Sequence, residues 1–88
     1  MRILYAKRVA KSVEKRQLPK EIWVDFQDAF ESFAKSGNFR LFDIRKLTTK
    51  GAYVYYRLRV RGYRALFHMD AESIFVEDIG PRGGIYKP

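Results

Sequence analysis

Tyr53-Val-Tyr-Tyr-Arg-Leu-Arg-Val-Arg-Gly-Tyr-Arg64 is the stretch around which the rest of this chain can be interpreted. Side chains of a strand point to opposite faces in turn, so its alternating pattern predicts two different faces. The apolar set is Val54, Tyr56, Leu58 and Val60, and the opposite set is Tyr55, Arg57, Arg59 and Arg61. The stretch therefore predicts a strand with one apolar face and one arginine face.

The dipeptide Arg61-Gly62 predicts a tight hairpin turn, because a two-residue turn containing Gly is a typical hairpin signal. The predicted register pairs Arg59 with Arg64, Leu58 with Ala65, Arg57 with Leu66 and Tyr56 with Phe67. Arg57, Arg59 and Arg64 then share one face, where like charges repel one another. We therefore expect this face to meet a polyanion.

The composition predicts one folded domain over residues 1–88, since 47% of the residues are hydrophobic and 16% are aromatic. The absence of Cys excludes disulfides and thiolate chemistry, and a single His leads us to expect no metal site and no cofactor. Lys and Arg number 18 against 10 Asp and Glu, for a net charge of +8. This charge favours an acidic binding partner. Nucleic acid is the first candidate and an acidic protein is the second. The alternative is that the charge only keeps the protein soluble.

The charge is also segregated along the chain. Residues 40–64 carry eight basic side chains and one acidic side chain. In residues 21–39 and 65–80, by contrast, most of the charged side chains are acidic. We expect such segregation in a protein that uses one face for binding. No signal peptide and no membrane-spanning apolar run is visible, so we expect a cytoplasmic protein without membrane contact.

The other elements are predicted from hydrophobic periodicity. Residues 2–5 read as a first strand, a helix begins near Ala6, and a second helix runs from about Lys20 to Lys35 and ends at Ser36-Gly37-Asn38. The apolar stripe of the second helix is Ile22, Trp23, Phe26, Ala29, Phe30 and Phe33, and we expect it to pack on a sheet. Residues 74–79 have apolar side chains at both odd and even positions, so both faces of this strand are expected to be buried. This pattern predicts a central strand. The order predicts an α+β fold, with two N-terminal helices on one face of a small, mostly antiparallel β-sheet.

Residues 39–50 are predicted to be a connector. Phe42 and Leu47 are expected to turn toward the core, while the basic side chains stay exposed. Three basic residues are further candidate positions for binding nucleic acid: Arg45, Lys46 and Arg61.

Four features of the second half of the chain resemble the RelE toxins of type II toxin–antitoxin systems, in the RelE/ParE superfamily. They are Asp43-Ile-Arg-Lys-Leu47, Tyr56-Arg-Leu-Arg-Val-Arg-Gly-Tyr-Arg64, Gly80-Pro-Arg82 and Tyr86. The order and length of the predicted elements resemble the family over essentially the whole chain. The late Arg82 and Tyr86 favour RelE over the gyrase-poisoning ParE members, which generally lack these residues.

The resemblance implies a RelE-like toxin domain that acts as a ribosome-dependent mRNA endonuclease (mRNA interferase). Such toxins cut mRNA in the ribosomal A site, and so inhibit translation, without a metal. It also implies a cognate acidic antitoxin as partner, with a monomeric toxin inside a hetero-oligomeric complex. We expect the antitoxin on the basic face and in an exposed groove beside the helices. The alternative is a ParE-like gyrase inhibitor or a catalytically weak binding protein of the same fold.

Carried over by motif, the implied catalytic residues are Arg57, Arg59, Arg64, Arg82 and Tyr86. Some RelE members have lysines where this chain has Arg57 and Arg59. Arginine stays protonated, so it can hold a phosphate but is a poor general base. Candidates for proton transfer are His68 and Lys50, and His68 is expected opposite Tyr55 on the arginine face. Tyr86 could stack on an RNA base or act as the general base. For His68 a structural role is the alternative, and the identity of the base stays open.

Overall fold

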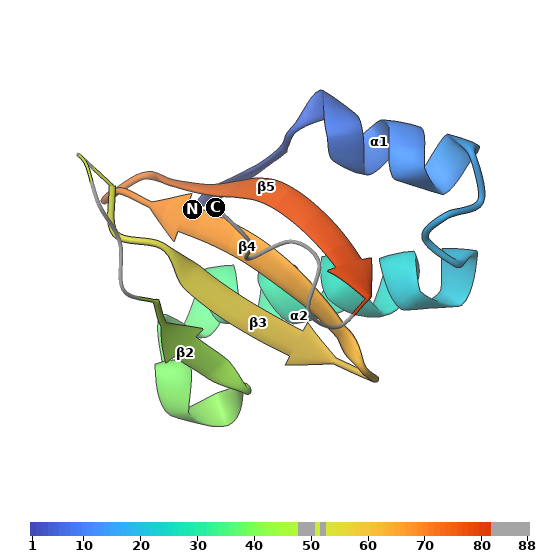
Figure 1. Ribbon diagram of the computed structural model, residues 1–88. Helices are drawn as coiled ribbons and strands as arrows, with labels where there is room; N and C mark the ends of the chain where they lie inside the picture. The colour runs from blue at the N-terminus through green and yellow to red at the C-terminus, as the bar shows by residue number, and fades with distance from the viewer. Residues whose placement is uncertain (48–50, 52, 82–88) are drawn as a thin grey trace.

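The computed structural model describes residues 1–47, 51 and 53–81. Its elements are β1 (Arg2–Tyr5), α1 (Lys7–Glu14), α2 (Lys20–Ser36), the 3₁₀ helix η1 (Phe39–Leu41), β2 (Ile44–Lys46), β3 (Tyr56–Val60), β4 (Tyr63–Met69) and β5 (Ser73–Pro81). The strands form one sheet in the order β1-β5-β4-β3-β2 (Figure 1). β1 is parallel to β5, and the other neighbours are antiparallel. The predicted α+β fold is confirmed.

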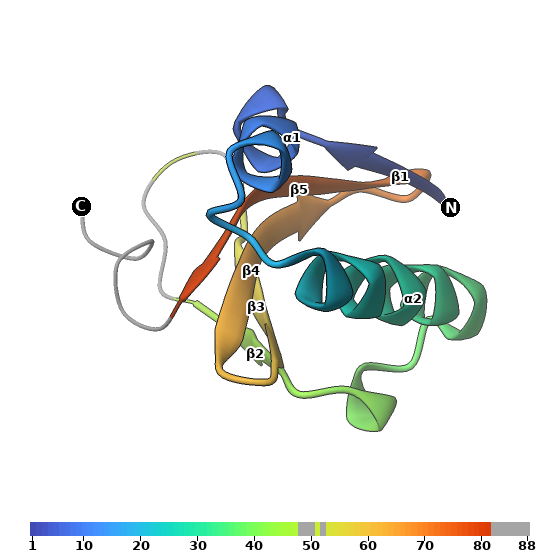
Figure 2. The same ribbon diagram turned by 90° about the vertical axis from the view of Figure 1, so that its right-hand side faces the viewer.

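The core lies between the helices and one face of the sheet. On α2, Ile22, Phe26, Phe30 and Phe33 are buried, as the apolar stripe predicts. Val9 of α1 is fully buried in the same cluster, so both helices contribute to one apolar layer. Figure 2 shows α2 along one side of the sheet and α1 beside β5 and β1. None of the described helices covers the opposite side, which we call the open face.

Tyr5 of β1 belongs to this apolar layer. Its ring packs edge-on against Trp23 at 4.7 Å and Phe30 at 6.2 Å between ring centroids. Burial, with a smaller contribution from the Glu31 carboxylate, raises the pKa of its hydroxyl to about 12. These ring contacts indicate that Tyr5 serves the packing of β1 against α2.

The helix ends follow the local sequence. Pro19 immediately precedes α2, and Gly37 ends it in the left-handed conformation at φ 63°, with its N–H donating to the Phe33 carbonyl at 2.8 Å. Glycine adopts this conformation without the steric cost of a Cβ. The predicted end at Ser36-Gly37-Asn38 is confirmed.

The β3–β4 hairpin has the register predicted from the sequence. Arg59 pairs with Arg64, Leu58 with Ala65, Arg57 with Leu66 and Tyr56 with Phe67. Arg61 and Gly62 have φ values of 50° and 82°, and two positive values characterise the type I′ turn that suits the twist of paired strands.

Replacing Gly62 with alanine is expected to lower the free energy of unfolding by about 1–2 kcal/mol, the cost of a left-handed L-residue. A Cβ at this position would meet no atom within 4 Å, so the cost is conformational and involves no clash. Urea unfolding followed by circular dichroism measures the change. Gly62→Asn is the control, because asparagine tolerates this conformation. Equal losses for the two variants would contradict the prediction.

A β-bulge in β5 sets which of its side chains face the core. Leu66 pairs with Asp78 and Phe67 with Val76, which leaves Glu77 as the extra residue. Val76 and Ile79 are therefore both buried in the core. In a regular strand, two residues three positions apart would point to opposite faces. β5 lies between β1 and β4, so the prediction that it is an interior strand is confirmed. Its apolar residues at both odd and even positions reflect the bulge, because no described helix covers the open face.

The predicted connector over residues 39–50 contains structure that the sequence pattern did not indicate. The helix η1 and the short strand β2 occupy part of it, and β2 pairs Ile44 with Leu58 and Arg45 with Arg57. A strand of three residues is too short to display a period of two. Phe42 packs against the core as expected, while Leu47 is half-buried.

Candidate functional site

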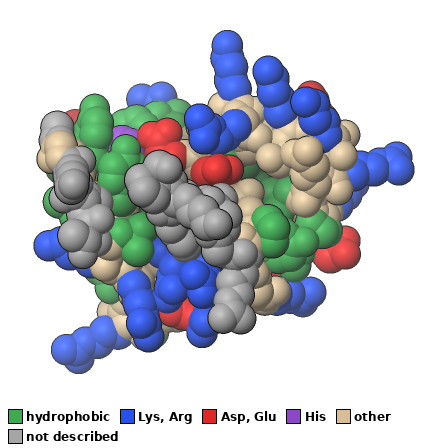
Figure 3. Space-filling model, in the orientation of Figure 1, with side chains coloured by type: hydrophobic (Ala, Val, Ile, Leu, Met, Phe, Trp, Pro, Cys, Tyr) green, Lys and Arg blue, Asp and Glu red, His purple; other side chains and the backbone are tan. Residues whose placement is uncertain are grey.

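Four arginines meet on the open face, and we call Arg45, Arg57, Arg59 and Arg64 the arginine cluster. The strand register brings them together, because Arg45 pairs with Arg57 across β2 and β3, and Arg59 pairs with Arg64 across the hairpin. Lys and Arg side chains gather over the lower part of this face in Figure 3. The prediction that Arg57, Arg59 and Arg64 share a face is confirmed.

Asp43 is the carboxylate that partly neutralises this cluster. Its Oδ2 accepts a hydrogen bond from Arg59 Nε at 2.8 Å, and its Oδ1 lies 3.6 Å from an Nη of Arg57. The Asp43 carbonyl also accepts the Arg59 backbone N–H at 3.0 Å, which holds the two strands together just before β2. One carboxylate thus orients two guanidinium groups on adjacent positions of the same face.

The two arginines held by Asp43 differ in burial. The side chain of Arg57 is 11% exposed, whereas that of Arg59 is 51% exposed. Arg57 Nε is buried and has no hydrogen-bond partner among the described residues. Buried donors are normally satisfied, so this N–H is suited to an oxygen supplied by a ligand. A phosphate oxygen fits, because guanidinium groups bind phosphate through directed hydrogen bonds.

His68 lies on the open face opposite Tyr55, as the register predicts, with ring centroids 5.3 Å apart. The residue is only 8% exposed, and its Nε2 lies 2.9 Å from Glu77 Oε2. Phe75 and Tyr53 pack against the ring at 4.9 Å and 4.4 Å between centroids. This environment fits a structural histidine, and a role in proton transfer stays a prediction.

Arg61 corrects one expectation from the sequence. Its Nε lies 3.0 Å from Oδ2 of Asp25 on α2, so its side chain is held on the helix side of the sheet. The expectation that it shares the face of Arg57 and Arg59 is wrong, because the left-handed turn ends the strand alternation at Val60. Lys46 is exposed and pairs with Tyr56, a residue of the core face, so strand alternation places it apart from Arg45.

Three other residues predicted for the site lie outside the described residues. They are Lys50, Arg82 and Tyr86. Their roles stay predictions. The residue that sequence reasoning missed is Asp43, although the alternation of Asp43 and Arg45 in Asp-Ile-Arg-Lys could have signalled that both point to the arginine face.

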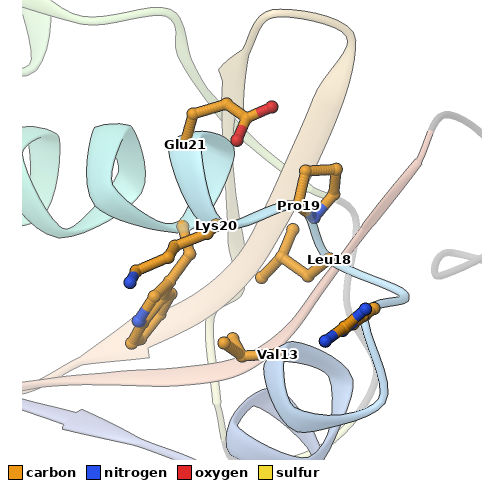
Figure 4. Close-up of a pocket in the computed structure, with 7 residues that line it drawn as sticks. Val13, Leu18, Pro19, Lys20 and Glu21 are labelled. Carbon is orange, nitrogen blue, oxygen red and sulfur yellow. The ribbon is translucent and has the colours of Figure 1, made fainter.

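A concave region lies between the two helices (Figure 4). It has a volume of about 470 Å³ and lies where α1 ends and α2 begins. Its lining is Val13, Arg16, Leu18, Pro19, Lys20, Glu21 and Trp23. Apolar side chains therefore combine here with charged ones, in a place that agrees with the predicted groove beside the helices.

The described ranges offer no group of three or more His, Asp and Glu side chains that could hold a metal ion. Nor does any helix within them have the length and apolar character needed to cross a membrane.

Two solved structures share this arrangement of helices and strands. A chain of the archaeal RelE–RelB complex from Pyrococcus horikoshii OT3 is 27% identical, with a TM-score of 0.73 over 93% of this chain and 94% of that one. The fold is RelE-like. A chain of the RelB–RelE antitoxin–toxin complex from Methanococcus jannaschii is also 27% identical, with a TM-score of 0.69 over 94% of each chain. By sequence, no family model and no curated protein matches.

The RelE-like fold agrees with the resemblance found in the sequence. The residues that carry that resemblance within the described ranges, from Asp43 to Arg64, form β2 and the hairpin. The arginine cluster is therefore built on the elements that the resemblance singled out.

Proposed function

We propose that this protein is the toxin of a toxin–antitoxin system, an endoribonuclease that cuts mRNA in the ribosomal A site and thereby inhibits translation. The observation that carries the proposal is the arginine cluster on the hairpin of a RelE-like fold. The likeness to chains of two RelE–RelB complexes supports a toxin as the general class. The net charge of +8 also suits a ribonucleoprotein target.

The proposed reaction uses the ribose 2′-hydroxyl as the nucleophile. Its oxygen bonds to the adjacent phosphorus, the bond from phosphorus to the 5′-oxygen of the next nucleotide breaks, and one proton leaves the nucleophile while another reaches the leaving oxygen. The protein must align these atoms and stabilise the charge that develops on the phosphate. Arginine is suited to the second task because its planar fork binds phosphate oxygens in pairs.

We assign Arg64 and Arg82 to the scissile phosphate, with Arg57 and Arg59 as further phosphate contacts. Arg57 Nε is buried without a hydrogen-bond partner among the described residues, which supports direct contact with an oxygen of the substrate. Tyr86 and Lys50 are the proposed candidates for proton transfer. His68 is a weaker candidate, because Glu77 already engages its Nε2 and the ring is buried.

Replacing Asp43 with asparagine is expected to tighten binding of single-stranded RNA about fivefold at low salt, since one negative charge leaves the phosphate-binding face. The gain should shrink as the salt concentration rises. Because Asp43 is 40% exposed, the cost in stability should stay below about 1 kcal/mol. Fluorescence anisotropy measures the affinity, and Asp28→Asn on α2 is the control with the same change in charge. Weaker binding by Asp43→Asn would show that orienting Arg57 and Arg59 matters more than charge.

Primer-extension mapping of mRNA in a translation reaction tests the proposed function. We expect new mRNA ends at A-site codons when the folded, antitoxin-free protein is added, and none when ribosomes are absent. No new ends under these conditions would refute the proposal. Gyrase-dependent DNA cleavage in a supercoiling assay would instead support the ParE-like alternative.

We further propose an acidic antitoxin as the partner. The arginine cluster supplies positive charge for acidic side chains of the partner. The concave region between α1 and α2 supplies apolar side chains beside Arg16 and Lys20. Co-expression with a short acidic protein encoded next to this gene should give a stable complex. Purification of the toxin alone from such cells would count against this partner.

A further inference from the structure

A group of aromatic side chains shares the open face with the arginine cluster. We call Tyr53, Tyr55, His68 and Phe75 the aromatic group. The rings of His68 and Phe75 are nearly parallel, at 18° and 4.9 Å between centroids, and those of His68 and Tyr53 are inclined by 31° at 4.4 Å. Tyr55 meets His68 edge-on at 79°. Figure 3 shows hydrophobic side chains around the single histidine on the left of this face.

Within the aromatic group, His68 is buried and Tyr53 is exposed. His68 is 8% exposed and its Nε2 lies 2.9 Å from a Glu77 oxygen, so the orientation of the imidazole ring is fixed. Tyr53 is 56% exposed although its ring lies against that fixed imidazole. Burial of Tyr53 in the core therefore does not explain its place, and its aromatic ring is exposed to solvent beside His68.

The strand register gives the position of this group relative to the arginine cluster. Tyr55 precedes Arg57 by two residues on the same face, and His68 follows Leu66, the partner of Arg57, by two residues. Two residues of a strand span about 6.6 Å. Tyr55 and His68 thus lie one step along the strands from Arg57, on the side away from Arg59 and Arg64. The Tyr53 ring lies against His68 and so borders the same end of the arginine cluster.

Aromatic side chains next to cationic ones on an open sheet face are suited to single-stranded RNA. Unpaired bases stack on exposed aromatic rings, while the backbone phosphates contact arginines. We propose that Tyr53, supported by His68, stacks an unpaired base of an RNA strand whose phosphates are held by the arginine cluster. Charge complementarity selects this ligand, and Tyr53 supplies an uncharged ring for a base while the arginines bind the phosphates. The inference rests on the proposed function only in taking RNA as the ligand.

The test measures binding to two fluorescein-labelled oligomers of equal length by fluorescence anisotropy without ribosomes. One is single-stranded RNA, and the other is an abasic ribose–phosphate chain. We expect the wild type to prefer the RNA, and Tyr53→Ala to weaken RNA binding about tenfold while leaving abasic binding unchanged. Tyr53→Phe should retain the preference because it keeps the ring. Leu41→Ala, which removes a 66% exposed apolar side chain from η1, is the control.

Two results would overturn the inference. Tyr53→Ala could bind both oligomers as the wild type does, which would show that the exposed ring makes no contact with an RNA base. The substitution could also weaken the binding of both oligomers equally, which would show that Tyr53 helps to position the arginines and does not contact a base. Thermal unfolding of each variant separates these results from loss of fold. Base-dependent binding without mRNA cleavage would refute the proposed function alone, and cleavage without base-dependent binding would refute this inference alone.

Discussion

Replacing Arg64 with glutamine is expected to slow mRNA cleavage on the ribosome by about 10²–10³-fold, the usual effect of removing one donor that stabilises transition-state charge. Arg64 lies opposite Arg59 on the hairpin, so its loss removes one guanidinium group from the arginine cluster. The measurement is the rate at which new mRNA ends appear in a translation reaction, read by primer extension.

Two variants make this test specific. Arg40→Gln removes the same charge from an exposed position on η1, outside the arginine cluster, and should leave the rate near that of the wild type. Arg64→Lys keeps the charge but loses the planar fork, so an intermediate rate is expected. A folded Arg64→Gln protein that cleaves at the wild-type rate would remove Arg64 from the proposed mechanism.

Replacing Phe30 with alanine is expected to lower the free energy of unfolding by about 3–5 kcal/mol, the typical cost of truncating a buried Phe. Phe30 is completely buried in the core. Its ring lies 5.3 Å from that of Phe67 on the sheet and 6.4 Å from that of Phe26 on α2. Small domains have only about 5–15 kcal/mol of stability in total, so this single change could leave much of the protein unfolded at physiological temperature.

Urea unfolding followed by circular dichroism measures the effect. Val24→Ala is the control, because Val24 lies on the same helix but is 43% exposed, and its truncation should cost less than about 0.5 kcal/mol. A loss below about 1 kcal/mol for Phe30→Ala would contradict the role of Phe30 in joining α2 to the sheet.

The sequence alone was sufficient for the elements with a long or strict pattern. The stripe of α2 extends over several turns, and four of its six predicted members are buried. The hairpin was predictable to the residue because alternation and turn type agree on one register. Both signals are local, since a period and a turn can be read from neighbouring residues. The resemblance to RelE toxins likewise came from residues 43–86, and the RelE-like fold agrees with it.

The candidate site was predictable only where it follows that alternation. Arg57, Arg59 and Arg64 were placed together correctly. Arg61 was not, because its pairing with Asp25 depends on a helix that lies far away in the sequence. The contact of Asp43 with Arg57 and Arg59 was also missed, since it depends on the pairing of β2 with β3, which the local pattern of three residues does not specify.

For the stretch from Tyr53 to Arg64, sequence and tertiary structure determine different things. Its residue order alone determined the register of the strands and the face shared by Arg57, Arg59 and Arg64. Only the tertiary structure brought Asp43 to these arginines and set Tyr53 and Phe75 beside His68. The physical reason is that alternation fixes the face on which a side chain lies, whereas its neighbours on that face come from other strands. Which residues those are depends on strand order and on the bulge at Glu77.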